Sequence, residues 1–413
     1  MKKIREWLGP HKNVRLLQLA SFMRHVCQGI AVVDVSLYLK DLGWSGGAIG
    51  GVWVGTGLFR TVMVSLAGPL HARLGAKHYM ILFEMITAAA ALIITLSRND
   101  IALCSAIMAA GFGRGHAGSG GPVSPIERGW LAAYARRFGH HVFGVNSLLV
   151  YAGMGIGSIL ASLPPLWERW LPGAQQYRPL FALMLIITLV NILVVLKVKR
   201  VNPDARLTDS PGTIQPTTAQ QEERTGFVDL VNGIAVTLST TMTSYWLSAK
   251  YAASSGMIGL VMAVSYLMAG EVSLANVSAA KRFGSATSVI CMQAIGIVFA
   301  LALPWAPWFW LAAVCNVGCV ACNLGARGNR SIVMMDRRNR RKRTWQSRTV
   351  SFVLRLGTVL WPGAFGHMIE EGQFALPFTI AAAMQAGATF WYGKVYRSKI
   401  KAEQEVRKKS LSG

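Results

Sequence analysis

Ionisable side chains lie inside long apolar stretches of this sequence, where they could do chemistry that needs shelter from water. Arg24 and His25 are near the middle of the first such stretch, Asp34 is in its later half, and Arg114 and His116 are in the fourth. A buried carboxyl group can bind and release a proton, and arginine can hold a carboxylate or phosphate through two hydrogen bonds. Charges in membrane-length apolar segments are candidates for function by default. We therefore take these five residues as the candidate substrate- or ion-binding set.

The stretches that carry these charges are long enough to cross a bilayer, since about 20 apolar residues span the hydrocarbon as a helix. The composition agrees, because 53% of the residues are hydrophobic and only 15% are charged, which would leave large apolar patches on a water-soluble domain. We predict twelve spans: Leu16–Lys40, Gly47–Leu70, Tyr79–Ser97, Ile101–Ile126, His141–Leu163, Pro179–Leu196, Thr225–Leu247, Ser255–Ser278, Thr287–Leu303, Trp308–Gly325, Thr349–Gly366 and Ala375–Gly393.

The positive charges predict how the chain is oriented. Most of the 42 Lys and Arg residues fall in alternate gaps between the spans, and cytoplasmic loops are the ones that retain such residues. Both termini are therefore predicted to be cytoplasmic, in a multi-pass protein of the cytoplasmic membrane. The net charge of +24 is then explained by loops that face anionic lipids. We expect no nucleic-acid partner, because the dense basic run Arg337–Arg343 has no interleaved aromatic residue.

Tryptophans support the same topology. An interfacial aromatic belt is expected where spans reach the headgroups. The tryptophans near the predicted outer ends are Trp44, Trp167, Trp170, Trp246, Trp305 and Trp308.

The chain divides into two related halves. Residues 197–224 form a polar segment without apolar periodicity and read as a cytoplasmic linker. We predict an N-terminal six-helix bundle over 1–196, a C-terminal six-helix bundle over 225–393 and a basic cytoplasmic tail over 394–413. The short basic sequence 71–75 after the second span recurs as 280–284 after the eighth, 209 residues later. A duplicated six-span unit is typical of transporters that rock two bundles about a central site.

The loop after the second span resembles a known signature. The major facilitator superfamily carries Gly-x-Leu-Ala-Asp-Arg-x-Gly-Arg-Lys between spans two and three, and Gly68, Leu70, Arg73, Gly75 and Lys77 match it. In the second half, the matching residues are Arg282, Phe283 and Gly284. The acidic position is Ala72 in the first half and Lys281 in the second, which suggests a different latch between the halves.

The resemblance implies an all-α membrane protein, with twelve transmembrane helices as two pseudo-symmetric six-helix bundles. In that fold, spans one, four, seven and ten line a central cavity, so the five candidate residues would face or support it. A second set is predicted to gate the cavity or join the bundles: Arg60, Gly68, Arg73, Gly75, Lys77, Glu84, Glu271, Arg282 and Gly284. We expect Glu84 to pair with Lys77 or Arg73, and Glu271 and Arg60 to be in a structural ion pair.

Three functions remain open. The first is proton-coupled export of amphipathic compounds, with Asp34 as the coupling carboxylate. It is favoured by Gly153–Gly157, which resembles the glycine-rich fifth span of export-type members. The second is transport of an organic anion, organophosphate or lipid headgroup by Arg24, Arg114 and Arg60. The third is a membrane sensor without transport.

The remaining predictions concern chemistry that the chain does not need. We expect no enzyme activity, no catalytic residue and no cofactor, because no nucleophile elbow or phosphate loop occurs in a fitting context. Cys315, Cys319 and Cys322 share one helical face, which we interpret as small packed residues rather than as a metal site. The expected partners are a small-molecule substrate, protons and anionic lipids, and the protein is expected to be a monomer.

Overall fold

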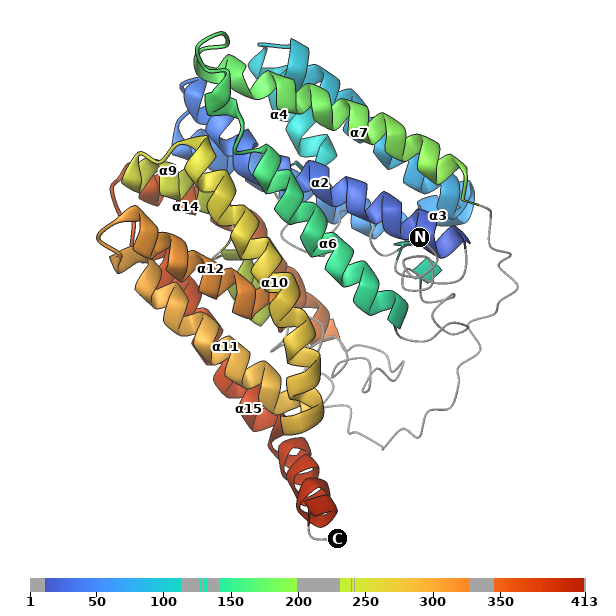
Figure 1. The fold of residues 1–413 in the computed structure, drawn as a ribbon, viewed down its shortest axis with the longest axis vertical. Helices are drawn as coiled ribbons and strands as arrows, with labels where there is room; N and C mark the ends of the chain where they lie inside the picture. The colour runs from blue at the N-terminus through green and yellow to red at the C-terminus, as the bar shows by residue number, and fades with distance from the viewer. Residues whose placement is uncertain are drawn as a thin grey trace. The chain divides into compact units, whose positions relative to one another are not determined.

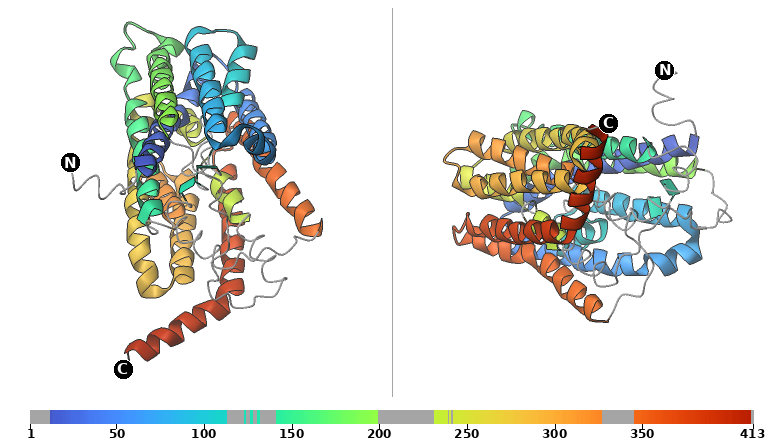
Figure 2. Two further views of the ribbon diagram at one scale, coloured as in Figure 1. Left: turned by 90° about the vertical axis from the view of Figure 1, so that its right-hand side faces the viewer. Right: turned by 90° about the horizontal axis from the view of Figure 1, so that it is seen from below.

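The computed structural model describes residues 12–112, 123, 126–127, 130–131, 141–198, 231–238, 240, 242–326 and 345–411. All the regular structure in this part of the chain is helical (Figures 1 and 2). The α-helices are α2 (Lys12–Asp41), α3 (Gly46–Leu96), α4 (Asp100–Ala110), α6 (His141–Leu160), α7 (Arg178–Leu196), α9 (Thr243–Tyr251), α10 (Ser255–Phe283), α11 (Ser285–Ala302), α12 (Phe309–Gly325), α14 (Trp345–Glu370) and α15 (Leu376–Leu411).

Short 3₁₀ segments connect several of these helices at the predicted outer side. They are η1 (Pro164–Leu166), η2 (Gly173–Tyr177) and η3 (Leu303–Trp305). Six segments are long and apolar enough to cross a membrane, and α4 and α12 are shorter apolar helices. The described helices therefore overlap the predicted spans, with differences at the fourth, seventh and twelfth.

The described chain forms two compact units. Unit 1 comprises residues 1–207, 242–267 and 362–370, and unit 2 comprises 208–241, 268–361 and 371–413. In unit 1, α2 packs along α6, and α3 packs against α4 and α7 (Figure 1). In unit 2, α11 packs against both α12 and α15. The two predicted six-helix bundles, 1–196 and 225–393, differ in extent from these units and remain a prediction.

Helix α7 shows how the molecule meets its surroundings. Its exposed face is apolar, with Ile186, Val190 and Leu193 at 58%, 43% and 59% exposure. Its buried face includes the polar residues Thr188 and Asn191, at 2% and 1%. A water-soluble helix has the opposite arrangement. The pattern fits a helix that faces lipid outward and polar neighbours inward.

Two glycines make the turns at which the sequence repeat was found. α3 contains two helices joined across a kink at Gly75, where φ is 75° and ψ is 157°. Gly284, which precedes α11, has φ 89° and ψ 146°. Only glycine adopts this backbone region without strain. The equivalence of 71–75 and 280–284 therefore extends from sequence to backbone conformation.

Three predicted spans differ from the helices found. The fourth span was predicted to run to Ile126, but α4 ends at Ala110, because Gly111 takes the left-handed conformation and caps it. The seventh span is interrupted at Met242, with φ 60°, just before α9. The twelfth continues as α15 to Leu411, through the segment predicted as a tail.

The exposed fractions of three tryptophans are compatible with the predicted aromatic belt, and that of one contradicts it. Trp170, Trp305 and Trp308 are 80%, 72% and 64% exposed, as residues that face headgroups should be. Trp246 is fully buried at 0%, with the Lys250 ammonium 5.3 Å from its ring centroid. Trp246 is near the end of a predicted span, but α9 packs against α2, and the sequence does not predict that contact.

We predict that Gly75→Ala lowers the free energy of unfolding by about 1–3 kcal/mol, since a side chain is strained at this φ and ψ. Gly284→Ala should have a similar effect. The measurement is thermal unfolding of the purified protein in one detergent. Gly68→Ala is the matched control, because Gly68 is helical and nothing lies within 4 Å of the Cβ position. Equal melting temperatures for Gly75→Ala and Gly68→Ala would contradict the prediction.

Candidate functional site

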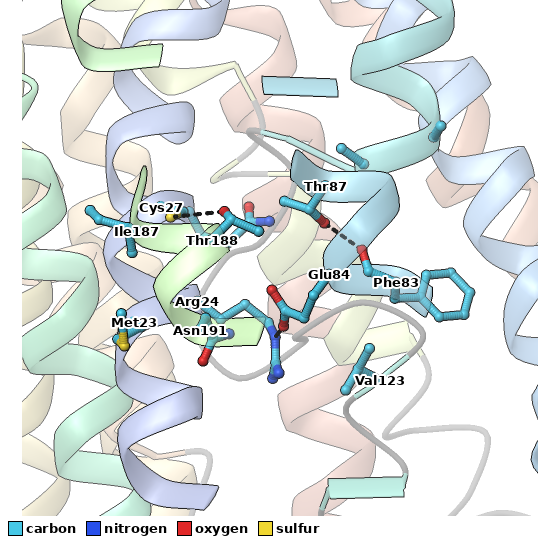
Figure 3. Close-up of a pocket in the computed structure, with 13 residues that line it drawn as sticks. Met23, Arg24, Cys27, Phe83, Glu84, Thr87, Val123, Ile187, Thr188 and Asn191 are labelled. Atoms are coloured by element: carbon cyan, nitrogen blue, oxygen red, sulfur yellow. Dashed lines mark hydrogen bonds and ion pairs between the residues drawn. The ribbon is translucent and has the colours of Figure 1, made fainter. Parts of the chain in front are cut away.

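Three helices of unit 1, α2, α3 and α7, bring polar side chains together around Arg24, and α4 adds apolar lining (Figure 3). Arg24, Cys27 and Gln28 share a face of α2, because residues three and four apart are neighbours on a helix. α3 contributes Glu84 and Thr87 at the same spacing. The remaining lining residues are Met23, Phe83, Ala109, Ala110, Val123, Ile187, Thr188 and Asn191.

Arg24 forms ion pairs with two carboxylates. Its Nε donates to Glu84 Oε1 at 2.8 Å, and its Nη1 donates to Glu127 Oε2 at 2.6 Å. The side chains of Arg24, Glu84 and Glu127 are 11%, 4% and 6% exposed. Figure 3 shows Arg24 and Glu84 pointing toward each other across the gap between α2 and α3. We call these three residues the Arg24 cluster.

The position of Glu127 is fixed by apolar neighbours on its own segment. Val123 and Leu131 are four residues to either side of Glu127, at 4% and 0% exposure, and both belong to a hydrophobic core with Leu17 and Tyr79. The Glu127 amide donates to the Val123 carbonyl at 3.0 Å, as in a helical turn. Glu127 therefore lies between two described apolar residues that pack in the same core as α2 and α3.

Within the described residues, the Arg24 cluster holds two carboxyl groups for one guanidinium, and Arg114, His116 and Arg128 lie outside those residues. A buried charge without a counter-charge is costly, by several kcal/mol. The guanidinium of Arg24 is therefore committed to these two carboxyl groups.

A small polar cavity lies beside the cluster. Its volume is about 50 Å³, which is room for a few water molecules. Several buried polar atoms here have no hydrogen-bond partner among the described residues: Arg24 Nη2, Gln28 Oε1, and Oδ1 and Nδ2 of Asn191. Buried polar atoms of this kind are normally satisfied by protein or by ordered water. The cavity is thus a polar site that can hold water or a small ligand.

Asp34 is the second buried acidic feature of α2. It is 0% exposed, and neither carboxylate oxygen has a hydrogen-bond partner among the described residues. Asp34 follows Arg24 by ten residues, which is about 15 Å along a helix axis. The Arg24 cluster and Asp34 are therefore separate places on one helix.

The other predicted binding residues fall into two groups. His25 is buried, and its Nδ1 is 2.7 Å from the Ser21 carbonyl oxygen. Arg114 and His116 lie outside the described residues. Of the five candidates, the structure thus places Arg24, His25 and Asp34, all on α2.

Of the predicted gating residues, Glu84 has a different partner from the expected one. It pairs with Arg24 rather than with Lys77 or Arg73, because its face of α3 turns toward α2. The Lys77 ammonium instead donates to the Leu196 carbonyl at the end of α7, where the helix dipole is negative. Arg73 is exposed.

The remaining gating residues lie on α3 and α10 or at the turns. Arg60 is half-buried on α3, and Glu271 is exposed on α10. Arg282 is exposed, with its guanidinium carbon 5.5 Å from the Phe283 ring centroid. Gly75 and Gly284 are the two turn glycines already described, and Gly68 lies within the first part of α3.

Sequence reasoning missed two members of the site. Glu127 was assigned to a cytoplasmic gap, because it follows an apolar run and precedes several arginines. Asn191 was treated as an ordinary residue of the sixth span. A usable signal existed for Asn191, since Thr188 and Asn191 stand three apart in an otherwise apolar helix. No local pattern predicts that Glu127 meets Arg24, 103 residues away.

Glycines bring α3 and α14 into close contact within unit 1. A Cβ atom on Gly50 would lie 2.2 Å from the Pro362 carbonyl oxygen, and one on Gly366 would lie 2.0 Å from the Gly46 carbonyl oxygen. Gly259 of α10 meets α6 in the same way, since a Cβ atom there would lie 2.7 Å from the Ser158 carbonyl oxygen. These contacts are at the ends of the helices predicted to face outward.

Among comparisons with known proteins, only those with solved structures found matches. No family model matches the sequence, and no curated protein does. The crystal structure of the nucleoside transporter NupG is 14% identical with a TM-score of 0.66, and the match covers 94% of this chain and 99% of that one.

Two inward-facing structures match over similar lengths. A bacterial homologue of the human lysosomal transporter Spinster is 13% identical with a TM-score of 0.62, covering 94% of this chain and 97% of that one. A bacterial homologue of the iron transporter ferroportin is 13% identical with a TM-score of 0.62, covering 93% and 98%. The chain therefore has the fold of major facilitator superfamily transporters and is a multi-pass membrane protein.

We predict that Arg24→Gln lowers the free energy of unfolding by about 3–5 kcal/mol, because two buried carboxylates lose their common cation. Arg169→Gln, at an exposed position, is the control and should change it by less than about 1 kcal/mol. Thermal unfolding in the same detergent measures both. A melting temperature for Arg24→Gln equal to that of Arg169→Gln would show that the cluster does not hold these helices together.

Proposed function

We propose that this protein is a secondary active transporter that moves a small solute across the membrane by alternating access, driven by a proton gradient. The fold supports transport rather than catalysis. Secondary transport of a solute against its gradient requires coupling to a second gradient, such as that of an ion. The buried acidic groups of α2 and its neighbours make the proton the best candidate.

Asp34 is the observation that carries the proposal. Its carboxyl group is fully buried in the first helix, with no hydrogen-bond partner for either oxygen among the described residues. An enclosed carboxyl without a cation or a donor is buried at much lower cost with a proton than without one. If alternating access exposes Asp34 to water in another state, it can lose that proton. A change of conformation would then carry the proton across.

The contacts of Arg24 favour this mechanism over transport of an organic anion. The anion alternative needs arginines with charge to offer, and Arg24 already has two carboxylate partners within 2.8 Å. A carboxylate or phosphate would have to displace one of these carboxyl groups from Arg24. The cost of leaving that buried carboxylate unpaired is the physical argument against the alternative.

The contact between α3 and α14 supports alternating access. Glycine lets the backbones touch at Gly50 and Gly366, and such contacts can separate without displacing large side chains. If the predicted topology is correct, the contact closes the outer side of the protein. It would open when the site turns outward.

The direction of transport has no support from the glycine-rich stretch of α6. A Cβ atom on Gly157 would lie 2.1 Å from the Val26 carbonyl oxygen of α2, and one on Gly155 would lie 2.9 Å from Leu267 of α10. Close packing accounts for these glycines. We therefore propose proton coupling without a direction of transport. The orientation of the pH gradient that drives flux would distinguish export from import.

The proposal is tested in proteoliposomes with a pH gradient imposed in either direction. Nucleosides, lipophilic cations and organic anions would be screened as solutes. We expect Asp34→Asn to reduce proton-driven flux about tenfold or more, the effect of about 1.4 kcal/mol on the rate-limiting barrier, while solute exchange without a gradient continues. Asp100→Asn is the control, since Asp100 is exposed in the first turn of α4. Proton-driven flux that survives intact in Asp34→Asn would rule out this carboxyl as the coupling group.

We also predict that Gly50→Ala reduces flux, because the added methyl group meets the Pro362 backbone and destabilises the closed contact by about 1–3 kcal/mol. Gly51→Ala is an adjacent control, with nothing within 4 Å of the Cβ position. The measurement is the initial rate of solute flux. Equal rates for the two variants would mean that the contact does not limit transport.

A further inference from the structure

Glu370, the last residue of α14, lies against the first turn of α3 within unit 1. A Cβ atom on Gly47 would lie 3.3 Å from Glu370 Oε2, and α3 begins one residue earlier, at Gly46. The first amide groups of a helix have no acceptor within the helix, so this end carries a partial positive charge. The Ser45 hydroxyl accepts from one of them, the Ala48 amide, at 3.1 Å. The Glu370 carboxylate therefore adds a negative charge at the positive end of α3.

We propose that Glu370 is an electrostatic latch, whose charge holds α14 against the start of α3 and so favours the closed form of this contact. The inference rests on the proposed function, because alternating access is what requires the contact to open. It adds the group that favours closure, whereas the glycines only allow the two backbones to approach.

Packing on α14 fixes where the carboxylate can reach. Gly366 is one helical turn before Glu370 and so lies on the same face of the helix. A Cβ atom on Gly366 would lie 2.0 Å from the Gly46 carbonyl oxygen, so the two backbones touch there. Phe365 and Ile369, which precede Gly366 and Glu370, are 0% and 4% exposed. The end of α14 is thus seated firmly enough to direct Glu370 at α3.

The neighbouring titratable groups leave α3 as the main positive partner of Glu370. Within the described residues, His367 is the side chain that pairs with Glu370, with Nδ1 3.9 Å from Oε2, and it is 68% exposed. The Tyr245 hydroxyl of α9 is close enough to be affected by the Glu370 charge, but it is neutral. Glu371 is exposed and carries the same sign. Histidine is mostly uncharged at about pH 8, which leaves the first turn of α3.

The expected strength of the latch is modest. The Glu370 side chain is 32% exposed, so water and salt screen its charge. A charge at an exposed helix end changes an equilibrium by about two- to fivefold at low ionic strength. A contact held by such an interaction can open in each transport cycle. The same charge is unfavourable at the C-terminus of α14 itself, so its removal would stabilise α14 while it weakens the contact with α3.

The test is hydrogen–deuterium exchange of the purified full-length protein at about pH 8 and low salt, where His367 is mostly neutral. The peptides followed are 46–56 from α3 and 362–370 from α14. We expect both to exchange about two- to fivefold faster in Glu370→Gln than in the wild type. Glu371→Gln is the adjacent control and should exchange like the wild type. Equal exchange in Glu370→Gln and Glu371→Gln would overturn the proposal.

Salt separates an electrostatic latch from a change in packing. At about 1 M salt, charges are screened within about 3 Å, so the difference between the wild type and Glu370→Gln should largely disappear. A difference of the same size at low and high salt would mean that packing holds the contact, and would exclude the latch. The proposed function is judged separately, by proton-driven flux in Asp34→Asn, so the failure of one is distinguishable from the failure of the other.

Discussion

The hydrocarbon around the protein is the constraint on which the rest of the structure depends. Lipid offers no hydrogen-bond partners, so the backbone must satisfy itself as helices. Apolar side chains can then face outward, as Ile186 and Leu193 do on α7, and polar side chains gather inside. Every buried polar group must find a partner within the protein or in enclosed water. This makes the interior polar groups informative about function, because each one is costly to keep.

Glycine is what lets the helices share that interior. Where α2 meets α6, a Cβ atom on Gly29 would lie 2.3 Å from the Met154 carbonyl oxygen. The contacts of α3 with α14 and of α10 with α6 use glycine in the same way. The second and eighth spans are equivalent in the duplicated sequence, and Gly50 and Gly259 are 209 residues apart, the spacing of the repeat. The two halves thus use equivalent glycines to approach partner helices.

The acidic groups of unit 1 give two different solutions to burial. Asp34 has no counter-charge among its described neighbours, so a bound proton is its means of becoming neutral. Glu84 and Glu127 share one arginine, so each has an opposite charge within hydrogen-bond distance. The two arrangements lie about 15 Å apart along α2.

The sequence by itself determined the features that repeat locally. Span-length apolar runs predicted the helices, and the repeat of 71–75 at 280–284 predicted equivalent loops, where the structure then shows Gly75 and Gly284 in a backbone conformation that only glycine tolerates. Charges in apolar runs marked Arg24, His25 and Asp34 as candidate binding residues, and the structure places all three on α2, while their binding role stays a prediction. The early end of α4 at Gly111 and the burial of Trp246 depend on packing that no local pattern contains. The tertiary structure alone decided that Glu84 and Glu127 share Arg24, since ion pairs between residues 60 and 103 positions apart depend on how helices pack rather than on sequence spacing.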